Sequence, residues 1–215
     1  MIEDTHPNNA RAWVVHPDIK SEISRKSAKP ALKEAVSLAK AMPKLNVQGS
    51  TLVVLPRPKA GMLFGKGKIE ELRRIFAKNK IEVVLIDGPL TPVQQRNLEK
   101  IWSVKILDRT GLILEIFSER AATREGVLQV EMAALTYQRT RLVRAWTHLE
   151  RQRGGLGFVG GPGETQIEAD RRAIDLQLSK LRQQLERVIK TRNLHRLARA
   201  NTPYPIVALV GYTNA

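Results

Sequence analysis

The pattern of apolar and polar positions divides the chain into two parts. In the first 120 residues, short continuous apolar runs alternate with segments whose apolar residues recur every three or four positions. The runs are typical of buried strands, and the recurrence is typical of one face of a helix. We therefore expect strands at residues 12–16, 51–55, 81–86 and 104–107, separated by helices.

Local signals support the helices between these strands. Thr91 suits an N-cap, Pro92 the first helical position, and Gln94 can complete a capping box. The Gly65–Lys68 segment is expected to be a loop that leads into a helix. Strands separated by helices of this length predict an α/β fold, a small mainly parallel sheet with crossover helices, over an N-terminal subdomain of residues 1–120.

Residues 121–200 follow a different pattern. Apolar residues between Leu128 and Leu149 are spaced 4-3-7-4-3, and those between Ile167 and Val188 are spaced 7-4-3-4-3. Both spacings are heptad seams, in which the skipped positions hold Arg139 and Arg171. They predict a long antiparallel α-helical hairpin with a glycine-rich tip loop at residues 154–163.

The tip loop has features that suit contact with RNA. Six of its ten residues are glycine, so its backbone can approach a phosphate or a base closely. Arg151 and Arg153 stand at its base, and Phe158 can stack on a base. Thr165 and Glu168 are expected to form a capping box that restarts the helix. The alternative interpretation is a loose linker.

Residues 201–215 read as a linker followed by a strand at residues 206–210 and a glycine turn. The last five residues match the first five positions of the phosphate-binding loop G-x-x-x-x-G-K-[ST]: Gly211, Tyr212, Thr213, Asn214 and Ala215. On spacing alone, a strand that ends in an ordinary turn fits as well. Because the Lys and the Ser/Thr of such a loop are not in this chain, we expect it to hydrolyse no nucleotide and to need no cofactor by itself.

The positive charge of the chain indicates which class of partner it binds. The formal net charge is +15, and residues 120–200 hold 16 Lys+Arg, of which 14 are Arg, against 8 Asp+Glu. Arginine makes forked contacts with phosphate, so the second half is expected to face nucleic acid. A merely solubilising surface charge is the alternative. No apolar run is long enough to span a bilayer.

The sequence gives little support for a disulfide, a metal site or a second phosphate-binding loop. Cysteine is absent, which excludes disulfides and thiolate metal sites and favours a cytoplasmic location. The four histidines, His6, His16, His148 and His195, have no metal-ligand spacing. Lys66 and Lys68, in the Gly65–Lys68 segment before a helix, can contact phosphate, although Glu70 and Glu71 already complement the helix dipole there.

Several segments together resemble the HflX family of ribosome-associated GTPases. The most specific are Arg144–Gln152 (RAWTHLERQ) and Gly161–Arg172 (GPGETQIEADRR). Further matching segments, in the family's order, are residues 64–72, 87–98, 108–114 and 207–215. The resemblance runs from about residue 50 to the end of the chain.

This resemblance implies an N-terminal α/β and hairpin region followed by a GTPase domain that binds GTP and Mg²⁺. It also implies a monomer that binds rRNA of the large ribosomal subunit, in a family whose members split ribosomes under stress, with the tip loop near the peptidyl-transferase region. The residues expected to contact RNA are Arg144, Arg151, Arg153, Gly154, Gly155, Phe158, Gly161, Gly163, Lys66 and Lys68.

Two other functions stay open. One is a nucleotide-binding enzyme that uses the Gly65–Lys68 loop to hold phosphate. The other is a protein-interaction module that pairs through its heptad seams as a coiled coil. The 14 arginines and the glycine-rich tip count against the second, because a coiled-coil adaptor has no need of them.

Overall fold

A computed structural model describes residues 9–20, 27–152, 162–201 and 207, without the side chains of residues 143–152 and 162–167. Four parallel strands form one sheet in the order β2-β1-β3-β4. The strands are β1 (Ala10–Ile19), β2 (Leu45–Leu55), β3 (Val83–Ile86) and β4 (Lys105–Asp108). The predicted α/β fold with a parallel sheet is therefore confirmed.

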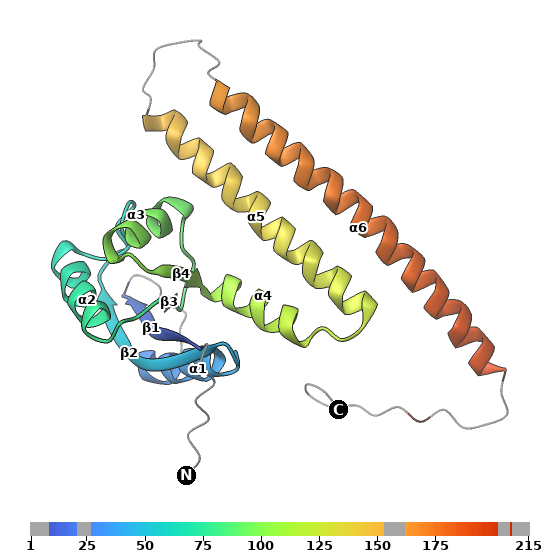
Figure 1. Ribbon diagram of the computed structural model, residues 1–215, viewed down its shortest axis with the longest axis horizontal. Coiled ribbons are helices and arrows are strands. Elements are labelled where there is room, and N and C mark those ends of the chain that lie inside the picture. The colour runs from blue at the N-terminus through green and yellow to red at the C-terminus, as the bar shows by residue number, and fades with distance from the viewer. Residues whose placement is uncertain (1–8, 21–26, 153–161, 202–206, 208–215) are drawn as a thin grey trace.

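Four helices cover the sheet, two on each face (Figure 1). They are α1 (Ala28–Lys40), α2 (Lys66–Lys78), α3 (Pro92–Trp102) and α4 (Arg109–Arg120). The core on one face joins α2 and α3 to the sheet, with Phe76 and Trp102 in edge-to-face contact at 5.0 Å. The core on the other face joins α1 and α4 through Ala39, Leu112 and Ile116.

The chain reverses its direction of travel across the sheet at β1. It passes from β1 to β2 on one side, then returns to place β3 and β4 on the other side of β1. In open α/β sheets of this kind, ligands bind beyond the carboxyl ends of the strands at the point of reversal. Here that point lies between β1 and β3.

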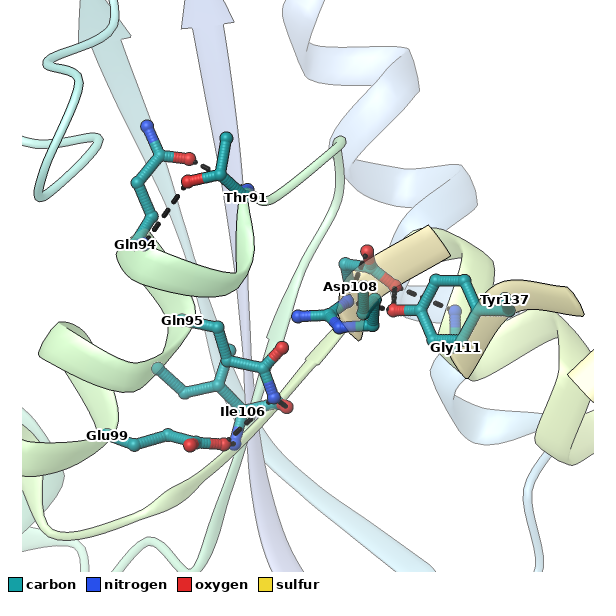
Figure 2. A network of polar contacts seen from close by, with 9 residues as sticks. Thr91, Gln94, Gln95, Glu99, Ile106, Asp108, Gly111 and Tyr137 are labelled. Carbon is teal, nitrogen blue, oxygen red and sulfur yellow. Dashed lines mark hydrogen bonds and ion pairs between the residues drawn. The ribbon is translucent and has the colours of Figure 1, made fainter. Parts of the chain in front are cut away.

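Side chains of α3 close the edge of the sheet at β4. The amide of Gln95 donates to the carbonyl of Ile106 at 2.8 Å, and the carboxylate of Glu99 accepts from the N–H of Ile106 at 3.1 Å (Figure 2). An unpaired strand edge invites pairing with another chain, so this clamp protects it. The same helix begins with the predicted capping box, in which Thr91 accepts from the N–H of Gln94 and Gln94 accepts from that of Thr91.

Two long helices, α5 (Arg124–Gln152) and α6 (Pro162–Ala200), run antiparallel and form an arm beside the α/β layers (Figure 1). On α6, the non-exposed residues between 168 and 200 are the predicted seam members: Ile174, Leu178, Leu181, Leu185 and Val188. On α5, Leu128, Met132, Leu135 and Leu142 are likewise shielded from solvent. The helical hairpin is confirmed.

Two local expectations were wrong. Lys66, Gly67 and Lys68 form the first turn of α2 and not a loop, because Gly65 takes the extended N-cap conformation one residue before them. Helix α6 begins at Pro162, so Thr165 lies inside the helix and is no N-cap; proline suits a first turn because its missing N–H has no partner there anyway.

Candidate functional site

An open cavity of about 660 Å³ lies at the point of reversal between β1 and β3. Its wall comes from the ends of these two strands and from the first turns of α1 and α4. The lining includes His16, Lys20, Ser27, Glu34, Asp87 and Arg109. The cavity thus occupies the place where this sheet topology puts ligand sites.

Hydrogen bonds and ion pairs link four of the side chains that line this cavity. The Nδ1 of His16 lies 2.7 Å from Oδ2 of Asp87, and both side chains are buried. Arg109 donates to Oδ1 of the same carboxylate at 2.7 Å and to Glu34 at 2.5 Å. The hydrogen bonds to Asp87 and Glu34 raise the pKa of Arg109. The guanidinium therefore stays charged and is already paired with two carboxylates, so the cluster can hold a polar small molecule.

Sequence reasoning missed this cluster. His16 was set aside because the histidines lack metal-ligand spacing. Asp87 and Arg109 were noted only within the segments that resemble the HflX family. A signal was present: a histidine in one buried apolar run and an aspartate directly after another. Parallel strands bring such positions to one sheet edge. Among the described residues, no group of three His, Cys, Asp or Glu is placed to hold a metal ion.

The residue before Arg109 joins the α/β part to the arm. Asp108 is the N-cap of α4, and its Oδ1 accepts from the N–H of Gly111 at 2.7 Å. The same oxygen accepts from the Tyr137 hydroxyl at 2.7 Å, and Oδ2 accepts from Arg141 at 3.2 Å (Figure 2). Arg141 also hydrogen-bonds to Tyr137 and lies over its ring. Asp108 is 4% exposed, so this is a buried anchor for α5.

Helix α5 consequently packs against other elements with two of its faces. Val130, Ala134, Tyr137 and Arg141, spaced 4-3-4, are at least partly buried toward the α/β part, whereas the seam faces α6. Within the seam, Arg139 pairs with Asp175 at 2.6 Å, and Arg171 lies 4.0 Å from the same carboxylate. The two arginines at skipped heptad positions thus share one carboxylate, Arg139 across the arm and Arg171 from within α6 itself.

Half of the ten predicted RNA-binding residues lie outside the part of the chain that the structure describes. Arg153, Gly154, Gly155, Phe158 and Gly161 lie outside the described residues, as do the predicted phosphate-loop residues 211–215. Arg144 and Arg151 lie on the last part of α5, and Gly163 lies in the first turn of α6; the side chains of this region are not described.

Lys66 and Lys68 are not brought to the cavity. They lie in the first turn of α2, where Lys68 pairs with Glu71 at 2.7 Å. Neither lines the cavity between β1 and β3. The cavity therefore lies at a different strand end from the Gly65–Lys68 segment, which the sequence offered as an alternative phosphate site.

Comparison with known proteins agrees with this architecture. The family described as "GTP-binding GTPase N-terminal" matches residues 29–118, and "GTP-binding GTPase Middle Region" matches residues 120–199. The boundary between the two matches, at residues 118–120, falls in the last turn of α4, shortly before the arm begins with α5.

Named relatives give the same assignment. The chain is 49% identical over 215 residues to GTPase HflX of Magnetococcus marinus, covering 100% of this chain and 49% of that protein. It is 50% identical over 160 residues to GTPase HflX of Escherichia coli, covering 74% of this chain and 37% of that protein. The chain thus spans about half the length of the curated relatives it matches, or less.

Solved structures share the fold. A crystal structure of SsGBP in complex with GDP matches with a TM-score of 0.58 at 18% identity, covering 85% of this chain and 45% of that one. A GTP-binding protein from the archaeon Sulfolobus solfataricus in complex with GDP matches with a TM-score of 0.54 at 17% identity, covering 83% and 45%. The chain therefore shares its fold with a little under half of each of these two proteins. The chain belongs to the HflX family of GTPases.

Proposed function

We propose that this chain is the ribosome-binding part of an HflX GTPase and that its arm carries the tip loop to rRNA of the large subunit. The observation that carries the proposal is the buried anchor around Asp108, which fixes α5 to the α/β part. An arm anchored in this way can present its far end at a fixed distance and direction.

The dimensions and charge of the arm suit that role. Helix α6 has 39 residues and is about 58 Å long. The arm's far end carries Arg144, Arg151 and Arg153 around a glycine-rich loop, the composition expected of a contact with phosphates and bases. We propose that these residues, with Gly154, Gly155, Phe158, Gly161 and Gly163, form the RNA contact.

We further propose that the residues 211–215 are the first positions of a GTP-binding loop. In such a loop, backbone N–H groups cradle the phosphates, and a Ser/Thr further along holds Mg²⁺. We place the protein in the cytoplasm as a monomer. No helix among the described residues is long and apolar enough to cross a membrane.

The test is a salt titration of binding to purified large ribosomal subunits. Contact through arginines requires the logarithm of the binding constant to fall steeply and linearly with the logarithm of the salt concentration. The double variant Arg151→Gln, Arg153→Gln should weaken binding at least fivefold. Arg73→Gln, Arg74→Gln on α2 removes the same charge elsewhere and should leave binding unchanged. Absence of binding by the wild-type chain would reject the proposal.

A second candidate function is binding of a polar small molecule, a nucleotide included, by the α/β part. The cavity beside Arg109 favours it, and it replaces the Gly65–Lys68 loop as the place of binding. Equilibrium dialysis with labelled ATP and GTP separates the two places. Binding lost in Arg109→Gln but kept in Lys66→Ala, Lys68→Ala would assign the cavity; the reverse would restore the loop.

The coiled-coil module is less well supported. Leu128 and Leu178, from the two seams, are buried against the partner helix of the same chain. A seam that is covered within the chain is not available to a second protein.

A further inference from the structure

The seam residues of α6 change from apolar to basic near the C-terminal end of the helix. Its apolar members end at Val188, but the same 4-3-4 spacing continues to Arg192, His195 and Arg199. All residues from 189 to 200 are exposed. The side of α6 that faces α5 therefore turns from apolar to basic.

This change coincides with the end of the partner helix. Arg192 forms an ion pair with Glu125, the second residue of α5. Residues 193–200 consequently extend past the start of α5, by about 12 Å (Figure 1). A seam position beyond the partner helix has no apolar surface to cover. The seam residues in this part of α6 are His195 and Arg199.

The charge at this end of the helix is of one sign. Residues 187–200 contain five Lys+Arg and no Asp or Glu, whereas residues 162–186 contain four Lys+Arg and five Asp+Glu. Two hollows of about 470 and 180 Å³ lie here. Glu125 is the one carboxylate in their linings, and it is paired with Arg192. We call the arginines of these linings the root surface: Arg124, Arg187, Arg192, Arg196 and Arg199.

We propose that the root surface binds the phosphodiester backbone of RNA, as a second contact at the opposite end of the arm from the tip loop. Guanidinium groups present several N–H donors in a planar fork that matches two phosphate oxygens. Residues three and four apart on a helix are neighbours, so Arg192, Arg196 and Arg199 form one row. The proposal deepens the function proposed above, on which its ribosomal setting rests.

The composition of this surface favours RNA over a lipid surface. A helix that lies on a membrane needs a wide apolar face. Beyond Arg192, the described large apolar residues that are exposed are Leu194 and Leu197, and their spacing places them on a different side of the helix from Arg192, Arg196 and Arg199. The basic side chains in the two hollows are five arginines and one histidine, with no lysine, and arginine suits phosphodiester recognition.

Two contacts at the ends of one rigid arm would have a consequence for affinity. Gly163 and Arg199 are separated by about 54 Å of helix. Once one end is bound, the other is held near its own site at a high effective concentration, provided both can be reached at once. The root contact would thus strengthen binding of the tip and fix the direction of the arm.

The experiment uses the full chain and two variants with equal loss of charge on α6. Arg196→Gln, Arg199→Gln removes part of the root surface; Lys180→Gln, Arg182→Gln removes two exposed cations outside it. Binding is measured to purified large subunits and, separately, to a labelled duplex RNA, across a salt series. Circular dichroism checks that each variant keeps its helices.

We expect the root variant to bind both targets at least fivefold more weakly, with a salt slope shallower by roughly 1.4 to 1.8, while the control variant matches wild type. Equal binding by the two variants overturns the root contact and leaves the proposed function standing. Wild-type binding to duplex RNA but not to subunits, with loss in the root variant, rejects the proposed function and keeps the root contact. Tighter binding to vesicles of phosphatidylcholine and phosphatidylglycerol than to RNA would assign the surface to a membrane and overturn the proposal.

Discussion

Tyr137, on the arm, donates its hydroxyl to Oδ1 of Asp108, the residue that ends β4 and caps α4, at 2.7 Å. The same oxygen accepts a hydrogen bond from the N–H of Gly111 at 2.7 Å. One carboxylate therefore stabilises the start of a helix and fixes a second helix to it. Burial, and next the hydrogen bond to Asp108, raise the pKa of Tyr137.

The anchor should be measurable by removing one hydroxyl. Tyr137→Phe keeps the ring but leaves a buried carboxylate oxygen with one partner fewer. We expect the free energy of unfolding in urea to fall by about 1–2 kcal/mol. Gln138→Ala, at the neighbouring exposed position on α5, serves as control and should change it by less than about 0.5 kcal/mol. Equal stability of Tyr137→Phe and wild type would show that the anchor contributes nothing.

The raised pKa of Tyr137 gives the anchor a defined pH dependence. The pKa is higher in the folded state than in the unfolded state, where it is about 10. The contribution is therefore fully present below pH 10 and is lost as pH rises through the folded-state value. The stability difference between wild type and Tyr137→Phe should be constant from pH 7 to 9 and shrink above pH 10. A difference that shrinks on acidification within that lower range would contradict the assignment.

Gly49 allows the closest packing between β1 and β2. The strand register skips Gln48, so that Trp13 pairs with Gly49, and a Cβ at Gly49 would lie 2.4 Å from the Trp13 ring. Trp13 is also held by its bond to Thr51 at 2.9 Å. Gly49→Ala should destabilise the protein by about 1–3 kcal/mol, because the indole must move. Ser50→Ala, exposed on the same strand, is the control; similar melting temperatures for both would reject the steric argument.

The Arg139–Asp175 pair should fix the alignment of α5 on α6 more than it adds stability. Both side chains are more than a third exposed, so a double-mutant cycle should give a coupling of only about 0.5 kcal/mol. Replacing both by leucine should leave stability equal or higher but relax the alignment, as polar seam residues specify register. Disulfide trapping between cysteines placed on the two helices measures the register. A single trapped register in the leucine variant would refute the role.

Much of the fold follows from the sequence. The strands, the helices between them, the cap at Thr91 and both seams were predicted, because each depends on spacing within a short segment. Element starts were harder to predict: Asp108 could not be identified as a cap from spacing, and Lys66–Lys68 was interpreted as a loop because Gly65 precedes it and Gly67 lies within it. The candidate site was largely missed, since His16 and Asp87 are 71 positions apart.

By itself the sequence determined which residues face inward on each helix, where the arm's seam runs and where it turns basic, because these depend on periods of 3.5 and 3.6 residues along one segment. Only the tertiary structure decided that β3 pairs with β1, so that His16, Asp87 and Arg109 meet, and that Tyr137 reaches Asp108. A period states which face of an element is buried. Which partner buries that face depends on how the strands are ordered, and local spacing carries no information about that order.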